Sequence, residues 1–156
     1  MPIYYEDTLE NLSAIHAGIR VVSATASLTN VLANSNIFNI ENGRVLLIDF
    51  YGENMAVVVA GVVTVAIHAI PDTGTTSIIA TATAVTGMTT GMKCFLPAFG
   101  GALGVTTSGY APLKTQPVYL LRPGVLNAVA SAVDAGTFRW FAFYVPVDVG
   151  AYMSAA

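Results

Sequence analysis

The order of apolar and polar positions predicts short strands separated by turns along most of the chain. Between residues 37 and 147, apolar runs rich in Val, Ile, Phe and Tyr alternate with clusters of Gly, Pro, Asn and Asp. β-branched and aromatic side chains pack well on a pleated surface, and the separating residues suit turns. We expect strands at 37–40, 44–51, 55–59, 62–70, 77–85, 93–96, 118–121, 125–133 and 137–147. This pattern predicts an all-β fold, a single-domain sandwich or barrel resembling a jelly roll.

The clearest local signal is Asn42-Gly43, within the stretch IFNIENGRVLLIDFY at residues 37–51. Both residues tolerate the positive φ that a type I′ turn requires at its two central positions. The pattern therefore predicts a hairpin whose two strands leave this turn and pair with each other. Glu41 and Arg44 would then face each other across the turn, a contact of about 0.2 to 1 kcal/mol that helps to fix the register.

A second hairpin is predicted at Pro71-Asp72-Thr73-Gly74. Proline sets φ at the first central position of a turn, and Gly74 accepts a strained exit from it. By composition, Gly52-Glu53-Asn54 is expected to be a further turn that separates two strands. Residues 97–109, with four glycines and no charge, are expected to form a long surface loop.

The ends of the chain carry weaker patterns. Residues 1–36 are expected to form an N-terminal arm, in which apolar positions at helical spacing from Leu12 to Val22 favour a short helix. The β-branched residues from Ile19 to Ala26 favour a strand instead. Residues 148–156 are expected to be a C-terminal tail, which leaves residues 37–147 as the β domain.

The low fraction of charged residues says more about this chain than any motif does. Charged residues make up 10% of the chain and apolar residues 54%, whereas about 25% is typical for charged residues in soluble proteins. A compact monomer of this size would expose roughly 7,500 Å², so each charged side chain would serve about 500 Å². We therefore expect much of the surface to be buried against other subunits in an assembly.

Several classes of protein fit the composition poorly. A net charge of −3 and six dispersed basic residues argue against nucleic-acid binding. The single cysteine, Cys94, excludes an internal disulfide and favours a reduced cytosolic origin, and the acidic start lacks the pattern of a signal peptide. Residues 54–71 carry no charge, but this window is short for a membrane helix and rich in Val, so it favours buried strands. A small membrane protein is kept as an alternative.

The sequence contains no recognisable constellation for catalysis, metal binding or cofactor binding. His16 and His68 are the available bases, and neither lies in a nucleophile motif. Together with Cys94 they lack the close paired spacing of a zinc site. The glycine-rich segment FGGALG lacks the Gly-Lys-Ser/Thr ending of a phosphate loop. We therefore expect no enzyme activity, no metal and no cofactor.

Aromatic and apolar residues on the predicted arm, the long loop and the last strand are candidates for contact surfaces. The segment TFRWFAFYVPV at residues 137–147 is the most aromatic, with alternate side chains expected on opposite faces of a covered strand. The candidate interface residues are Tyr4, Tyr5, Phe95, Phe99, Leu103, Tyr110 and Trp140.

The segments IFNIENGRVLLIDFYGE, AIPDTGTT and GTFRWFAFYVPVDVGA together resemble small virion proteins of tailed bacteriophages, of the head decoration or cement type. The resemblance covers roughly residues 37 to 151. The chain departs from that pattern at Asn42, where a second glycine is usual, and at Val149, where a second acid often precedes the glycine. The resemblance implies no catalytic residue.

The resemblance and the low charge together predict a phage structural protein that forms a homo-oligomer, expected to be a trimer. It would be made in the host cytoplasm, reside in the virion and reinforce the shell by binding the major capsid protein or another virion protein. A tail or head-fibre component is an alternative. Another is a glycan- or host-surface-binding module that uses Phe99, Tyr110 or Trp140.

Overall fold

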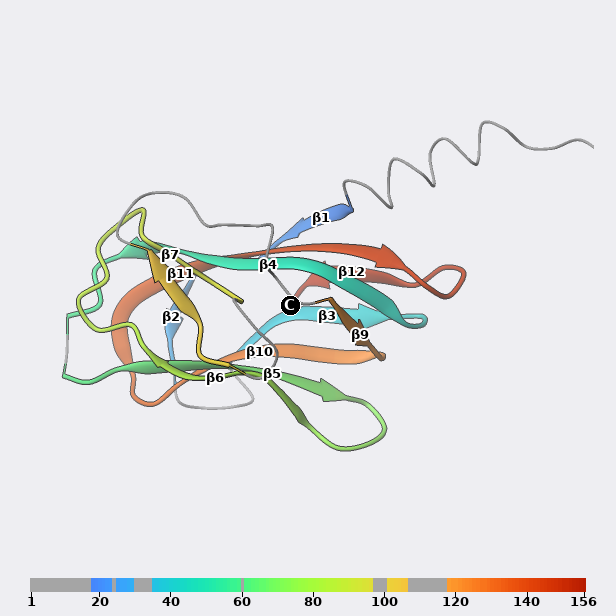
Figure 1. The fold of residues 1–156 in the computed structure, drawn as a ribbon, viewed down its shortest axis with the longest axis horizontal. Helices are drawn as coiled ribbons and strands as arrows, with labels where there is room; N and C mark the ends of the chain where they lie inside the picture. Colours follow the sequence, from blue (N-terminus) through green and yellow to red (C-terminus); the bar gives the residue numbers. More distant parts are fainter. Residues whose placement is uncertain (1–17, 24, 30–34, 60, 97–100, 107–117) are drawn as a thin grey trace, which may run out of the picture.

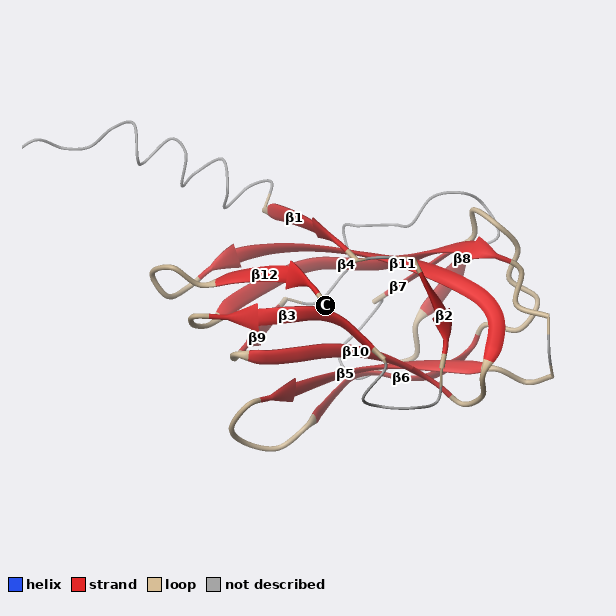
Figure 2. Cartoon of the chain, turned by 180° about the vertical axis from the view of Figure 1, so that it is seen from behind, coloured by secondary structure: helices blue, strands red, loops and turns tan. Residues whose placement is uncertain are grey.

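The fold is all-β and consists of two antiparallel sheets packed face to face (Figure 1). The computed structural model describes residues 18–23, 25–29, 35–59, 61–96, 101–106 and 118–156. These residues contain no helix (Figure 2). The strands are β1 (Ile19–Val22), β2 (Ala26–Leu28), β3 (Asn36–Glu41), β4 (Val45–Ala56), β5 (Thr64–Pro71), β6 (Ser77–Ala84), β7 (Lys93–Phe95), β8 (Gly104–Thr106), β9 (Tyr119–Leu121), β10 (Gly124–Ala130), β11 (Asp134–Pro146) and β12 (Tyr152–Ala155).

The first sheet has seven strands, in the order β1-β11-β4-β7-β8, with β2 beside β11 and β9 beside β4. The second sheet has five strands, in the order β12-β3-β10-β5-β6. This arrangement is consistent with the sandwich that the strand pattern predicts. The jelly-roll arrangement stays a prediction.

The turn at Asn42-Gly43 has the predicted backbone, but it does not make a hairpin. Asn42 has φ 61° and Gly43 has φ 144°, so both residues adopt the expected positive φ. However, β3 pairs with β10 and β12 in the second sheet, whereas β4 pairs with β11, β7 and β9 in the first. The turn is therefore a corner that carries the chain from one sheet to the other, and the predicted pairing was wrong.

The corner at Asn42-Gly43 lies beside a second corner, residues 147–151, which carries the chain from β11 to β12 (Figure 2). The Val147 N–H donates to the Arg44 carbonyl at 2.9 Å, and the Arg44 N–H donates to Asp148 Oδ2 at 2.8 Å. A Cβ added at Gly43 would lie 2.7 Å from the Asp148 Cβ. Glycine is thus required both by the backbone and by the neighbouring corner.

The hairpin predicted at Pro71-Asp72-Thr73-Gly74 is confirmed, since β5 and β6 pair on either side of it. The turn predicted at Gly52-Glu53-Asn54 is wrong, because β4 continues through these residues to Ala56. Gly52 lies opposite Trp140, and a Cβ added at Gly52 would lie 2.5 Å from the Trp140 Cζ3. The glycine makes room for an indole ring and does not turn the chain.

The predicted limits of the β domain were also too narrow. Residues 148–156, expected to be a tail, contain β12, which forms one edge of the second sheet. Gly104–Thr106, expected to lie in a loop, pairs with β7 as strand β8. At the N-terminal side the strand alternative holds for Ile19–Val22, and the expected arm is wrong for residues 26–28 and 36, which belong to β2 and β3. Residues 1–17, 24 and 30–34 of the expected arm and helix lie outside the described residues.

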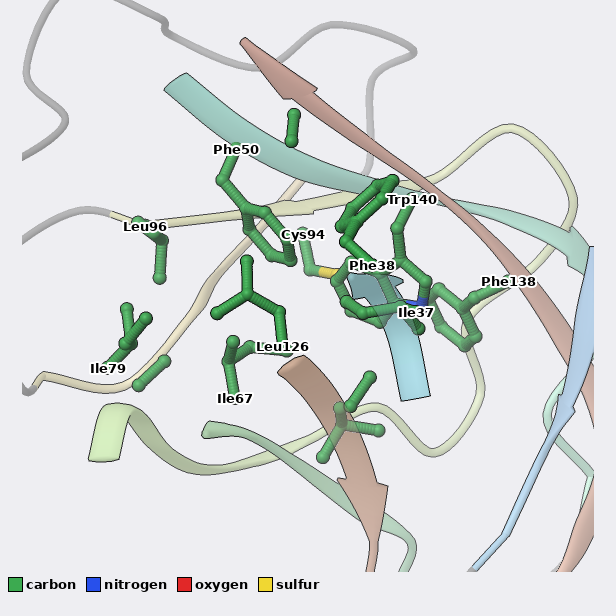
Figure 3. Packing of buried hydrophobic residues seen from close by; sticks show 14 of the residues in the cluster. Ile37, Phe38, Phe50, Ile67, Ile79, Cys94, Leu96, Leu126, Phe138 and Trp140 are labelled. Atoms are coloured by element: carbon green, nitrogen blue, oxygen red, sulfur yellow. The ribbon is translucent and has the colours of Figure 1, made fainter. Parts of the chain in front are cut away.

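An aromatic cluster fills the space between the sheets (Figure 3). Phe50 of β4 stacks on Trp140 of β11 at a ring-centroid distance of 5.2 Å, and Phe138 lies 5.6 Å from Trp140 on the same strand. Phe38 of β3 meets Phe50 edge-on from the opposite sheet. Ile67 and Leu126 are also fully buried on that sheet. The burial of these aromatic and aliphatic side chains is the main contribution to the stability of the fold.

Candidate interface surfaces

The structure separates the predicted contact residues into three groups. Trp140 and Leu103 are buried in the core, with 3% and 4% of their surface exposed, so neither offers a contact surface in this chain. Phe95 is half-buried on β7, on the outer face of the first sheet. The remaining candidates lie outside the described residues: Tyr4, Tyr5, Phe99 and Tyr110.

An aromatic row crosses the outer face of the first sheet. Its members face one another across strands β1, β11, β4, β7 and β8, and they are Val22, Phe141, Tyr51, Phe95 and Gly104. Tyr51 stacks on Phe141 at 4.6 Å and 14° between ring planes. Gly104 leaves space for the Phe95 ring, whose Cζ would lie 2.3 Å from an added Cβ.

Charged side chains border the aromatic row on both sides. On one side, Glu53 of β4 lies between Arg139 of β11 and Lys93 of β7. Lys93 Nζ forms an ion pair with Glu53 Oε1 at 3.3 Å. On the other side, the Arg20 guanidinium lies 5.2 Å from the centre of the Phe141 ring, a cation–π contact. This face therefore combines apolar rings with hydrogen-bonding groups at their edges.

A bulge in β4 places an acid beside the aromatic row. Phe143 pairs with Asp49 but Tyr144 pairs with Leu47, so Ile48 is an extra residue in β4. The extra residue reverses the alternation of β4, which keeps Leu47 and Phe50 both in the core and leaves Asp49 on the outer face. Burial raises the pKa of Asp49 to about 6, and the hydrogen bond from the Phe50 N–H opposes this shift.

The second sheet differs sharply in charge. Its five strands contain one charged side chain, Glu41, whereas the strands of the first sheet contain six: Arg20, Asp49, Glu53, Lys93, Asp134 and Arg139. Glu41 accepts hydrogen bonds from the Tyr152 and Ser154 hydroxyls of the neighbouring strand β12. The outer face of the second sheet is thus nearly free of charge.

A further apolar surface lies at the end of the sandwich where β4 leads into β5 and β10 into β11. Val62 and Val133 have 80% and 68% of their surface exposed, and Val57 and Val59 are exposed beside them. The loops are tied together, since the Val59 N–H donates to Asp134 Oδ1 and the Thr64 N–H donates to the Ser131 hydroxyl. We call these four valines the valine end.

Sequence reasoning missed the valine end because Val57, Val59 and Val62 were assigned to strands. The isolated Gly61 between two Val pairs was the available signal, since it adopts φ 50° in the connecting loop. The aromatic row was missed because Tyr51, Phe95 and Phe141 come from three strands far apart in the sequence.

The residues considered for chemistry are dispersed. Cys94 is fully buried against Gly52, and burial raises the pKa of its thiol to about 12, which leaves it a poor nucleophile. His68 lies on the outer face of the second sheet, opposite Asn127. Within the described part of the chain, no group of three or more His, Cys, Asp or Glu residues is placed to hold a metal ion.

Residues 54–71, the window considered for a membrane helix, form the end of β4, a loop and β5. Among the described residues no helix is long and apolar enough to cross a membrane. Comparisons with known protein families, with curated proteins and with solved structures found no match.

Proposed function

We propose that this chain is a non-enzymatic structural protein of a bacteriophage virion, a decoration or cement protein that binds and reinforces the capsid. The observation that carries the proposal is the charge distribution of the second sheet, whose five strands contain one charged side chain. This charge-poor sheet also carries exposed large side chains, Ile78 and Tyr152, which favours cover by another protein. The resemblance of residues 37–151 to phage head proteins supplies the class of partner.

The distribution of charged and exposed apolar residues suggests two contact surfaces. The outer face of the second sheet is the proposed contact between copies of the chain, in a homotrimer. The valine end is the proposed contact with the capsid lattice, because its exposed valines offer apolar area with no charge to desolvate. Reinforcement would then come from apolar burial across many identical sites of the shell.

A pair of matched variants tests the proposal. Val129 of β10 lies on the outer face of the second sheet and Val105 of β8 lies in the first sheet. We expect Val129→Lys to convert the oligomer to monomer in light scattering and to abolish binding to purified shells that lack this protein, while Val105→Lys does neither. Equal melting temperatures of the two variants would show that both fold. A wild-type chain that is monomeric at micromolar concentration and does not bind shells would overturn the proposal.

The valine end is tested separately. Val62→Lys should leave the oligomer intact but reduce shell binding at least tenfold, since it puts a charge into an apolar contact. The copy number in purified virions, measured by mass spectrometry, distinguishes a shell component from a tail or fibre component. Hundreds of copies favour decoration, whereas a few copies favour the tail or fibre.

The aromatic row supports a second candidate, a glycan- or host-surface-binding module. Sugars stack on aromatic rings and hydrogen-bond to charged groups at ring edges, and Phe95 and Tyr51 are bordered by Glu53 and Lys93. The stacking of Tyr51 on Phe141 already covers part of these ring faces. Glycan-array binding that is lost in Phe95→Ala and kept in Val129→Lys would favour this function over reinforcement.

A further inference from the structure

A cavity of about 290 Å³ opens at the side of the sandwich, between the β5–β6 hairpin of the second sheet and strand β9 of the first. Its inner wall includes Ala69, Ile79 and Leu121, and the lining as a whole offers about as much polar as apolar surface. Ile78 and Leu120 flank it and are 57% and 56% exposed, respectively. Exposed apolar side chains therefore lie on both sides of the cavity.

Three contacts hold the walls of the cavity in place. The Tyr119 hydroxyl donates to the Ile79 carbonyl at 3.1 Å and joins the two sheets. The Asp72 N–H donates to the Pro123 carbonyl at 2.9 Å and joins the β5–β6 hairpin to the turn before β10. At Gly124 the backbones approach so closely that an added Cβ would lie 2.2 Å from the Ile70 carbonyl oxygen. The cavity is thus formed before any ligand arrives, which lowers the cost of binding.

The polar residues of the lining define the kind of ligand. The hairpin contributes Thr73, Thr75 and Ser77, and the turn after β9 contributes Arg122. Arg122 is exposed, and within the described part of the chain it forms no ion pair with a carboxylate. Hydroxyl-bearing residues and an arginine in a lining of mixed polarity fit a ligand with a short apolar body and an anionic head.

The volume limits the size of that ligand. One water molecule occupies about 30 Å³ in the liquid, so the cavity has room for about ten groups of that size. A carboxylic acid with a chain of about eight carbons has this number of non-hydrogen atoms. We propose that the cavity binds a medium-chain carboxylate, with its alkyl chain against Ile79 and Leu121 and its head group at Arg122.

Titration of the purified chain with sodium octanoate, below its micelle concentration, tests the proposal by NMR. We expect saturable binding with one site per chain, with the largest shifts at residues 69–79 and 119–125. Arg122→Gln should weaken binding about fivefold, as expected for loss of one exposed ion pair. Asp72 is exposed on the same hairpin, and Asp72→Asn should leave binding equal or tighter because a nearby negative charge is removed.

Matched controls separate this site from general apolar binding. Arg139→Gln on the first sheet should leave the affinity unchanged, as should Val105→Ser, whereas Leu120→Ser should weaken binding. Octanol, which has the same chain and no charge, should bind wild type and Arg122→Gln equally. No saturable binding, shifts located elsewhere, or equal affinity of wild type for octanoate and octanol would overturn the proposal. All of these substitutions are at exposed or half-buried positions, and an unchanged melting temperature confirms folding.

Discussion

Arg44 binds both carboxylate oxygens of Asp148 across the two corners that join the sheets. Arg44 Nη2 lies 2.7 Å from Asp148 Oδ1, and Nε lies 2.9 Å from Oδ2. The Arg44 N–H donates to the same carboxylate. This fork-to-fork pair joins the residue after the first corner to a residue of the second. Instead of facing Glu41, as the hairpin prediction implied, Arg44 contributes to the closure of the sandwich.

The Arg44–Asp148 pair predicts a loss of stability in acid. The hydrogen bonds from Arg44 lower the pKa of Asp148 to about 2, below an ordinary value of about 3.9. The pair therefore stabilises the fold fully above about pH 4, and this stabilisation is lost as the pH falls toward 2. Asp148→Asn should have a lower urea midpoint than wild type at pH 7. At pH 2 the midpoints of the two proteins should be closer together. Arg44→Gln should reproduce this trend, and a difference that is independent of pH would contradict it.

Gly43 and Gly61 form a matched pair for the corner. Both have positive φ. An alanine Cβ at position 43 would lie 2.7 Å from the Asp148 Cβ, whereas one at position 61 would have no neighbour within 4 Å. We expect Gly43→Ala to reduce the free energy of unfolding by about 2 to 4 kcal/mol, from backbone strain plus steric overlap. Gly61→Ala should cost about 1 kcal/mol, from strain alone. Equal costs in urea denaturation would show that the corner does not require close packing.

The fit of Trp140 over Gly52 predicts a compensating pair of substitutions. Gly52→Ala places a methyl group 2.5 Å from the Trp140 ring, and overpacking of this kind costs about 1 to 3 kcal/mol. Trp140→Phe leaves a smaller ring and should itself destabilise the chain. In the double variant the second substitution should cost less than in wild type, because the phenyl ring leaves room for the methyl. A double-mutant cycle in urea measures this coupling, and additive effects would exclude the proposed fit.

Asp49 predicts a second pH dependence of opposite sign. Because burial raises its pKa to about 6, the folded chain binds the proton more tightly than the unfolded chain. Its contribution to stability therefore falls as the pH rises from about 4 to about 6, and it is constant above that range. Asp49→Asn should be more stable than wild type at pH 7 by about 1 kcal/mol, a value reduced for solvent screening at a half-exposed site. The two proteins should converge near pH 4, and the NMR titration of the carboxyl carbon would locate the transition.

The positions of most strands could be predicted from the sequence, because β-branched and aromatic runs are local features. The same holds for the positive φ of Asn42, since few residues other than Asn, Asp and Gly tolerate it. The partner of each strand could not be predicted. The turn at Asn42-Gly43 gives the direction of the chain but not the sheet that β4 joins, which depends on β11 about ninety residues later.

Glycine shows the same division. The sequence Gly52-Glu53-Asn54 is typical of a turn. In the structure, however, a glycine is needed at position 52 because the Trp140 ring of another strand occupies the space of a side chain. Trp140 in turn suggested an exposed aromatic anchor, although Gly52 and Phe50 enclose it in the core. The candidate surfaces were beyond prediction for a related reason. The aromatic row, the charge-poor sheet and the cavity each combine side chains whose proximity arises from long-range pairing.

The pairing of β4 with β11 has a consequence for synthesis. Val45–Ala56 is a largely apolar strand, and its main partner begins at Asp134. Ribosomes add about 5 to 20 residues per second, so β4 emerges several seconds before β11 exists. During that interval its apolar side chains and unpaired backbone groups can contact other nascent chains that are being translated from the same messenger RNA. Slower growth at low temperature, or excess holding chaperone, should therefore raise the yield of soluble protein more than it does for a helical protein of equal length.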